Sequence, residues 1–161
     1  MSPKYKNIKE ELEACKQDGF NIKFIKNPQE AVQLVAVIYN GYSIKYIKTP
    51  SEAVQLEAVK RNSYNIKFIK NPYEAVQLEA LRRNVYSIQY IKNQYESVQL
   101  EACRQNGRSI KYIKNPSLEV QLEACKQDSE SIQFIKDPEA LLKKYPALCI
   151  WNKQALRFIM L

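Results

Sequence analysis

Residues 71–92, NPYEAVQLEALRRNVYSIQYIK, form one copy of a 22-residue unit that repeats along most of the chain. Proline marks one position of the unit, at Pro28, Pro50, Pro72, Pro116 and Pro138, and Gln94 stands there in the remaining copy. A unit of this length cannot bury a core alone, so its copies have to stack on their neighbours. The sequence therefore predicts an array of stacked units.

Capping signals divide the unit into a long helix and a short one. Asn71 is the expected N-cap of the long helix, Pro72 its first residue and Glu74 its capping-box partner. The long helix is expected to close in the left-handed conformation that Asn and Gly tolerate, as at Asn40-Gly41 and Asn106-Gly107. A second N-cap is expected to open a helix of barely more than one turn, of α or 3₁₀ type. These second caps are Asn21, Ser43, Asn65, Ser87, Ser109 and Ser131.

Together these signals predict an all-α fold, a right-handed superhelical solenoid of about seven 22-residue long-helix/short-helix repeats. The composition agrees, because only three glycines occur and most prolines share one phase of the unit. We expect a single helical-repeat domain over residues 1–161. Its parts are an N-terminal capping repeat at 1–26, five regular repeats at 27–136 and a degenerate C-terminal capping repeat at 137–161.

A broad apolar arc on the long helix is expected to face the core, with Val76, Leu78, Ala80 and Leu81 on it. Glutamine occupies the middle of this arc in five copies, at Gln33, Gln55, Gln77, Gln99 and Gln121. An unsatisfied buried polar group costs about 1–3 kcal/mol. The glutamines are therefore expected to bond to one another or to turn carbonyls between repeats.

Residues suited to chemistry are scarce. The chain has no histidine, which removes the usual general base, most zinc sites and the common nucleophilic triads. Cys15, Cys103 and Cys125 share one core position of the repeat, where cysteine acts as a small hydrophobe, and Cys149 lies outside the regular register. We expect no catalytic residues, no metal site and no cofactor, so the protein is not expected to be an enzyme.

Lysine is the strongest functional signal, because the chain has a net charge of +8 and the short helices carry lysines without intervening acids. Stacked repeats would align these lysines in a basic stripe of Lys23, Lys26, Lys45, Lys48, Lys67, Lys70, Lys92, Lys111, Lys114 and Lys136. An aromatic column runs beside it, with Phe20, Tyr42, Tyr64 and Tyr86, and changes to Arg108 and Glu130 in later repeats. Such a face suits nucleic acid. Two alternatives stay open: the rings fill the seam between repeats, or an AT-rich genome raises the lysine content.

A second candidate surface lies in the second repeat, where Val35, Ile38 and Tyr39 replace the polar residues of the other long helices. An apolar cluster on a polar surface favours a protein partner or a second copy of this chain. The alternative is that the N-terminal segment with Tyr5 and Lys6 folds over it. The C-terminal segment, which includes Trp151 and Phe158, is apolar enough either to cap the last core or to form a dimer contact.

The NPxEAVQLEA helix followed by the SIKYIK segment resembles the leucine-rich repeat variant family, over about residues 7 to 140. It is also similar to uncharacterised families of short helical repeats in bacterial, phage and giant-virus proteins. The resemblance implies a curved superhelix of alternating long and short helices and supplies no catalytic residues.

The sequence favours a non-enzymatic binding scaffold that engages a protein partner through one face of the solenoid, as an inhibitor or adaptor in a bacterial or phage context. The partner is expected to be acidic or a nucleoprotein complex, and a homodimer is an alternative occupant. The competing hypothesis is nucleic-acid or ribonucleoprotein binding through the lysine stripe. No apolar run reaches the roughly 18 residues of a membrane span, so a cytoplasmic protein is expected.

Overall fold

The computed structural model describes residues 5–148, and all regular structure in this range is helical. Long α-helices alternate with six-residue 3₁₀ helices, and consecutive pairs pack in the same way, so the predicted all-α helical-repeat solenoid is confirmed. The chain divides into two compact units, within residues 1–91 and within residues 92–161, here called unit 1 and unit 2. Trp151, Phe158 and Cys149 lie outside the described residues.

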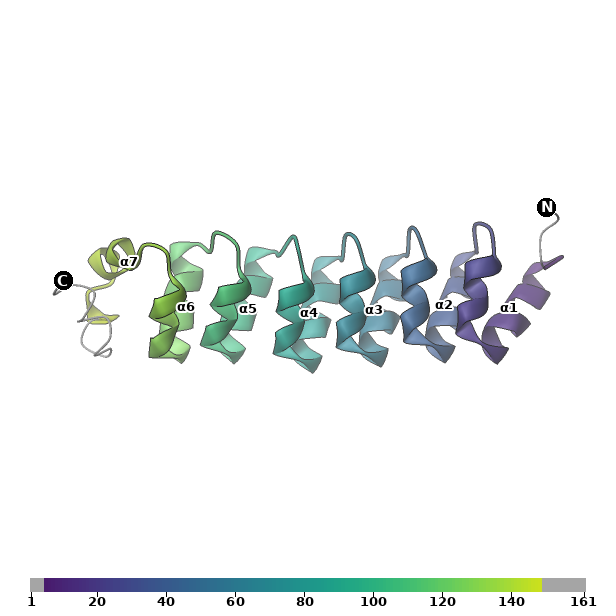
Figure 1. The fold of residues 1–161 in the computed structure, drawn as a ribbon, viewed down its shortest axis with the longest axis horizontal. Helices are drawn as coiled ribbons and strands as arrows, with labels where there is room; N and C mark the ends of the chain where they lie inside the picture. The colour runs from purple at the N-terminus through teal and green to yellow at the C-terminus, as the bar shows by residue number, and fades with distance from the viewer. Residues whose placement is uncertain (1–4, 149–161) are drawn as a thin grey trace. The chain divides into compact units, whose positions relative to one another are not determined.

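Unit 1 holds four long helices and four 3₁₀ helices. They are α1 (Ile8–Gln17), η1 (Gly19–Phe24), α2 (Glu30–Tyr39), η2 (Gly41–Tyr46), α3 (Glu52–Arg61), η3 (Ser63–Phe68), α4 (Glu74–Arg83) and η4 (Val85–Tyr90). The α-helices form one layer and the 3₁₀ helices the other, with the core between them (Figure 1). Each turn from a 3₁₀ helix leads back to the next long helix.

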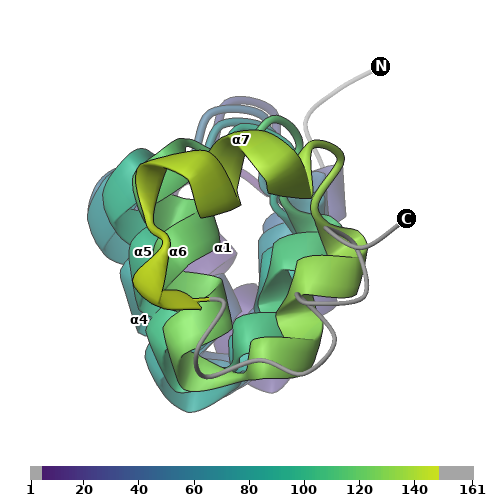
Figure 2. The same ribbon diagram turned by 90° about the vertical axis from the view of Figure 1, so that its left-hand side faces the viewer.

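Unit 2 repeats the arrangement and ends in a different helix. Its elements are α5 (Glu96–Gln105), η5 (Gly107–Tyr112), α6 (Leu118–Gln127), η6 (Ser129–Phe134) and α7 (Pro138–Lys144). The α7 helix lies across the end of this unit (Figure 2), and its Leu141 and Leu142 join the buried core of α5 and α6. Asp137 caps α7, because its Oδ1 accepts a 3.0 Å hydrogen bond from the Ala140 N–H.

The helices α2 to α6 begin two residues later than the predicted cap, whereas α1 begins directly after its N-cap Asn7. In α4 the N-cap position is Tyr73 and the first helical residue is Glu74, so Asn71 is not the cap and Glu74 is not a capping-box partner. The Pro72 carbonyl is taken by the side chain of Gln77, whose Nε2 donates to it over 3.0 Å. The Asn-Pro pair therefore belongs to the preceding turn.

A single extended residue joins each long helix to its 3₁₀ helix. Asn84 has φ −161° and ψ 111°, its N–H donates to the Ala80 carbonyl, and its carbonyl accepts from the Ser87 N–H. Its side-chain Oδ1 also accepts from the Tyr86 N–H over 3.0 Å. The N-cap of the 3₁₀ helix is therefore Asn84, three residues before the predicted cap Ser87, and the other predicted second caps are wrong in the same way. An Asx side chain can hold this joint because it bonds locally to the backbone.

The predicted left-handed helix ends are also wrong, because Asn40 and Asn106 have φ near −155° and neither Gly41 nor Gly107 has a positive φ. Space explains the glycine at these joints. A Cβ on Gly107 would lie 2.4 Å from the Ala124 carbonyl oxygen, in the neighbouring repeat. At Gly107 the backbone of the next repeat is therefore too close for a side chain, although Ser63 and Val85 occupy the equivalent position in other repeats.

The core follows the predicted positions, with Val76, Ala80 and Leu81 buried and Leu78 half-buried. Each 3₁₀ helix adds one fully buried isoleucine, at Ile22, Ile44, Ile66, Ile88, Ile110 or Ile132. The repeated glutamines bond to turn carbonyls, five residues before each. Gln55 also bridges to the next repeat, where its Oε1 accepts from the Tyr73 N–H.

Candidate ligand-binding face

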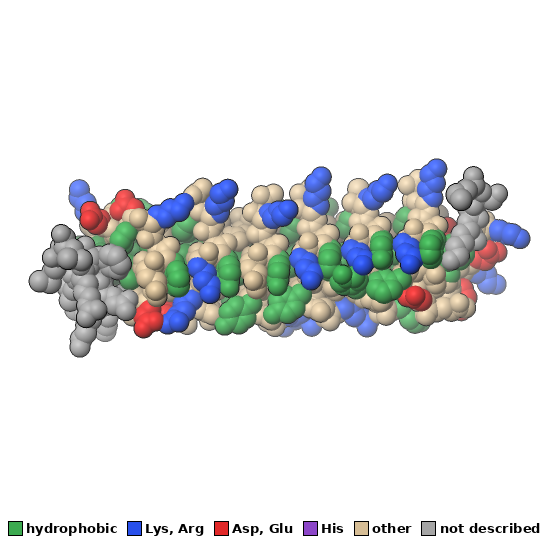
Figure 3. Space-filling view, in the orientation of Figure 1, with side chains coloured by type: hydrophobic (Ala, Val, Ile, Leu, Met, Phe, Trp, Pro, Cys, Tyr) green, Lys and Arg blue, Asp and Glu red, His purple; other side chains and the backbone are tan. Residues whose placement is uncertain are grey.

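All ten lysines of the predicted stripe are exposed, and all lie on the 3₁₀ layer. In unit 1 they form two rows, and unit 2 has the turn row but only one stripe lysine on its 3₁₀ helices, Lys111; the basic side chains can be followed over this layer in Figure 3. One row lies on the 3₁₀ helices, at Lys23, Lys45, Lys67 and Lys111, with glutamine at the equivalent places in η4 and η6. The other lies in the turns that follow, at Lys26, Lys48, Lys70, Lys92, Lys114 and Lys136.

The stripe lysines differ from the arginines in how their charge is balanced. Every arginine in the described part of the chain forms an ion pair with a carboxylate. Over the same residues, none of the ten stripe lysines does. Unit 1 therefore presents six lysines without a paired acid on its 3₁₀ layer, whereas its long helices carry neutralising pairs such as Glu57 with Arg61.

A second aromatic column, which sequence reasoning missed, accompanies the lysines of the 3₁₀ helices. It consists of the last residue of each 3₁₀ helix: Phe24, Tyr46, Phe68, Tyr90, Tyr112 and Phe134. Phe24 is 49% exposed and Tyr46 39% exposed, so both rings are accessible. The signal was present in the sequence, as an aromatic residue that recurs every 22 residues directly after a lysine or glutamine.

Each lysine of the 3₁₀ helices lies over the ring of the next residue, as Lys23 does over Phe24 at 4.7 Å and Lys67 over Phe68 at 4.9 Å. Lys45 also contacts a ring three residues before it, because residues three apart eclipse one another in a 3₁₀ helix. The Lys45 Nζ lies 4.2 Å from the centroid of Tyr42, three residues before it, and 4.8 Å from that of Tyr46. These are cation–π distances. Rings of neighbouring repeats also meet edge to face, since Phe20 lies 6.0 Å from Tyr42 and 5.9 Å from Tyr46 between centroids.

These contacts define one surface, which we call the lysine–aromatic face. It comprises Lys23, Lys26, Lys45, Lys48, Lys67 and Lys70 of unit 1 with the exposed rings of η1 to η4. The rings pack across the seam between repeats and remain partly exposed. The expectation that they fill the seam and the expectation that they face a ligand are therefore compatible.

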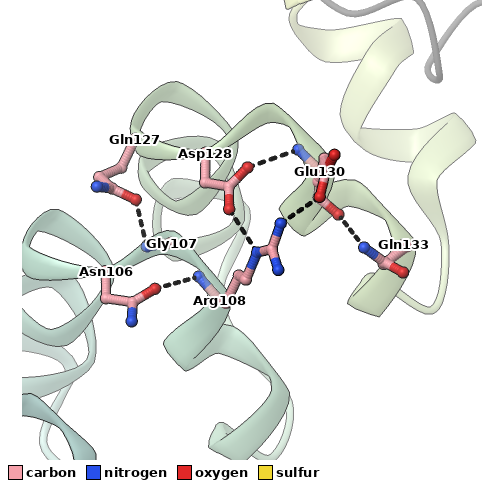
Figure 4. A network of polar contacts seen from close by, with 7 residues as sticks. All are labelled: Asn106, Gly107, Arg108, Gln127, Asp128, Glu130 and Gln133. Atoms are coloured by element: carbon pink, nitrogen blue, oxygen red, sulfur yellow. Dashed lines mark hydrogen bonds and ion pairs between the residues drawn. The ribbon is translucent and has the colours of Figure 1, made fainter.

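Unit 2 carries an ionic cluster at the equivalent place. Arg108 stands where unit 1 has Tyr42, and its Nε donates to Asp128 Oδ2 over 2.7 Å (Figure 4). Its guanidinium also contacts the carboxylate of Glu130. The hydrogen bond from Arg108 holds the pKa of Asp128 below its usual value, and the pKa of Arg108 is raised. In unit 2 this cluster replaces the rings of the first aromatic column, whereas Phe134 of the second column is still 38% exposed. Both ring columns therefore accompany the lysines in unit 1 alone among the described residues.

The predicted apolar cluster lies on α2, in the long-helix layer of unit 1. Ile38 is 40% and Tyr39 58% exposed, while Val35 is half-buried. The N-terminal segment is tied to α1, because the Lys6 N–H donates to Glu10 Oε2 over 2.9 Å. With more than half of Tyr39 open, the described part of that segment leaves the ring uncovered.

The three described cysteines have the properties of core residues. Burial raises the pKa of Cys103 to about 12 and those of Cys15 and Cys125 to about 11, so the thiolate is strongly disfavoured. Within residues 5–148 there is no group of three or more His, Cys, Asp or Glu residues arranged to hold a metal ion. No helix in this range is both long and apolar enough to cross a membrane.

Comparison with protein-family models, with curated proteins and with solved structures finds no match to this chain. The resemblance of its repeat to the leucine-rich repeat variant family stays an expectation.

Proposed function

We propose that this protein is a non-enzymatic scaffold that binds single-stranded nucleic acid along the lysine–aromatic face of unit 1. The observation that carries the proposal is the contrast in charge balance. Every described arginine is paired with a carboxylate, whereas none of the six lysines on this face is. Unpaired cations held in rows are suited to a repeating polyanion.

The rings favour a single strand over a duplex. Single-strand binders combine cations that follow the phosphates with aromatic side chains on which bases stack, worth about 1–3 kcal/mol per base. Phe24, Tyr46 and Tyr86 are each between 39% and 49% exposed beside the lysine rows. Bases inside a duplex cannot reach such rings, whereas the bases of a single strand can.

Fluorescence anisotropy with a labelled oligonucleotide, titrated at several salt concentrations, tests the proposal. For a single strand each phosphate contact contributes about 0.7 to the slope of log K against log salt. A triple variant, Lys45→Gln, Lys48→Gln and Lys67→Gln, should therefore lower that slope by about 2. Polyglutamate of the same length should compete poorly, because it offers no bases.

A matched control removes the same charge from the long-helix layer of unit 1, with Lys9→Gln, Lys16→Gln and Lys60→Gln, all exposed positions. This triple should change the slope little. Equal losses in the two triples would mean that net charge alone attracts the strand. Absence of binding by the unmodified protein at low salt would overturn the proposal.

The exposed apolar cluster on α2 supports a second candidate function, docking of a protein partner. Ile38 and Tyr39 are exposed where α3 carries Lys60 and Arg61. An Ile38→Glu and Tyr39→Glu variant should lose any self-association detected by light scattering, or any partner captured by the unmodified protein. Unchanged assembly and capture would rule this function out.

A further inference from the structure

A pocket of about 480 Å³ lies between the first two 3₁₀ helices of unit 1. One wall comes from η1 and the turn that leads to α2, and the other from the end of η2 and the turn that leads to α3. The volume is within the range of small-molecule sites, roughly 300–1,000 Å³. This pocket opens on the lysine–aromatic face.

The pocket is cationic, because Lys23, Lys26 and Lys48 line it and no carboxylate does. Lys26 and Lys48 come from two successive turns and line the pocket from its two walls. Thr49 adds a hydroxyl where the other turns carry Asn or Asp. These donors are suited to a phosphate group, which accepts several hydrogen bonds at once.

The rest of the lining is apolar and aromatic. Ile22, Ile25 and Ile47 are buried at its base. Phe24 and Tyr46 line it as well and keep 49% and 39% of their surface exposed. A flat, apolar group placed against these rings would gain stacking as well as burial.

One wall of the pocket is fixed before any ligand arrives. Asn27 has φ 57°, in the left-handed region, and is followed by Pro28, whose ring fixes its own φ. Gln33 Nε2 donates to the Pro28 carbonyl over 2.9 Å and ties this turn to α2. Because the turn is already ordered, a ligand does not have to order it on binding.

We propose that this pocket binds a 5′-nucleotide, with the phosphate between Lys26 and Lys48 and the base against Phe24 and Tyr46. The same chemistry is offered by a free nucleotide and by one nucleotide of a bound strand. In the second case the pocket is an anchoring subsite of the face and rests on the proposed function. The phosphate and the base of the nucleotide both contribute contacts, so a ligand with only one of them should bind less tightly.

Isothermal titration calorimetry of the full chain with 5′-AMP, adenosine and ribose 5-phosphate tests this. AMP should bind at least about tenfold more tightly than either fragment, because each fragment lacks one of the two sets of contacts. A Lys26→Gln and Lys48→Gln variant should lose at least about tenfold in AMP affinity. A Lys9→Gln and Lys60→Gln variant removes two charges from exposed long-helix positions outside both the pocket and the lysine–aromatic face, and should stay within about twofold.

Each other outcome is decisive. If AMP bound no better than ribose 5-phosphate, or if the two lysine pairs lost equal affinity, the pocket would not be a nucleotide site. If the oligonucleotide bound but AMP did not, the pocket proposal would fail while strand binding stood. If AMP bound through Lys26 and Lys48 but no oligonucleotide did, the pocket would be a site for free nucleotides and the proposed function would fail.

Discussion

Arg108 Nε donates a 2.7 Å hydrogen bond to Asp128 Oδ2, twenty residues further on, and so ties η5 to the residue that caps η6. The same carboxylate accepts from the Glu130 N–H through its other oxygen. Asp128 therefore caps η6 and also bonds to Arg108 of the preceding repeat. In unit 1 the equivalent seam is closed by rings, as between Phe20 and Tyr42.

Because Arg108 is half-exposed, its contribution to stability should be small and should depend on salt. We expect Arg108→Ala to lower the melting temperature slightly at low ionic strength. The difference from the unmodified protein should vanish in 1 M NaCl, where the screening length is about 3 Å. Asp128→Asn, which keeps the capping oxygen, should behave in the same way, and an additive double variant would show that the two residues do not interact.

Gly19 should be intolerant of any side chain. A Cβ there would lie 2.3 Å from the Ala36 carbonyl oxygen and 2.9 Å from Ser43 Oγ. We expect Gly19→Ala to lower the free energy of unfolding by about 1–3 kcal/mol, as overpacking does, measured by chemical denaturation. Ser63→Ala is the matched control at the same position of a later repeat, where a Cβ is already present, and should be close to neutral.

Gln77 should stabilise the protein through its amide. It is 1% exposed, and its Nε2 donates to the Pro72 carbonyl over 3.0 Å. Gln77→Leu preserves the approximate size but leaves that carbonyl without its donor, so we expect a loss of about 1–3 kcal/mol. Gln17→Leu, at an exposed position of α1, is the control. A Gln77 variant as stable as this control would show that the bond contributes nothing.

The repeat period, the helical class and the core positions could be predicted because each depends on local pattern. Val76, Ala80 and Leu81 recur at helical spacing, and burial follows from the stacking that a short unit requires. The start of the long helix could not be predicted in this way. Asn followed by Pro is a capping signal and also a turn signal, and the side chain of Gln77 decides between them by taking the Pro72 carbonyl.

Only part of the candidate site could be predicted from the sequence: the lysines, but not their contacts with the rings or the pocket. The lysine rows can be predicted from the 22-residue spacing, but the contact of Lys45 with Tyr42 follows from the 3₁₀ form of the short helix, in which residues three apart eclipse. One wall of the pocket includes Asn27 in the left-handed conformation, which Asn115 also adopts but Asn71, in a similar sequence, does not. Such a choice is made by packing between repeats, which a single repeat does not encode.

Glu79 should make the protein sensitive to acid. Hydrogen bonds from Arg82 and Arg83 lower its pKa from 4.5 to about 2. A carboxylate whose pKa is lowered by folding contributes stability that is complete above its unfolded pKa, near 4.5, and is lost as the pH falls towards 2. Glu79→Gln should therefore be less stable than the unmodified protein at pH 7, with the difference closing between pH 4.5 and 2. Glu52→Gln, at an exposed position of α3, serves as the control, and a pH-independent difference for Glu79→Gln would contradict the assignment.

The buried thiols of Cys15, Cys103 and Cys125 should not react with thiol reagents while the protein is folded. A thiol reagent attacks the thiolate, and burial raises the pKa of Cys103 to about 12 and that of Cys15 to about 11, far above a working pH near 8. We expect a Cys149→Ser variant, which leaves only the three described cysteines, to react with Ellman's reagent at the rate at which the structure opens. Added denaturant should then release all three thiols together if a single cooperative unit opens, or in two phases if unit 1, with Cys15, opens apart from unit 2. Immediate labelling of the native variant would show that these side chains are not buried in a closed core.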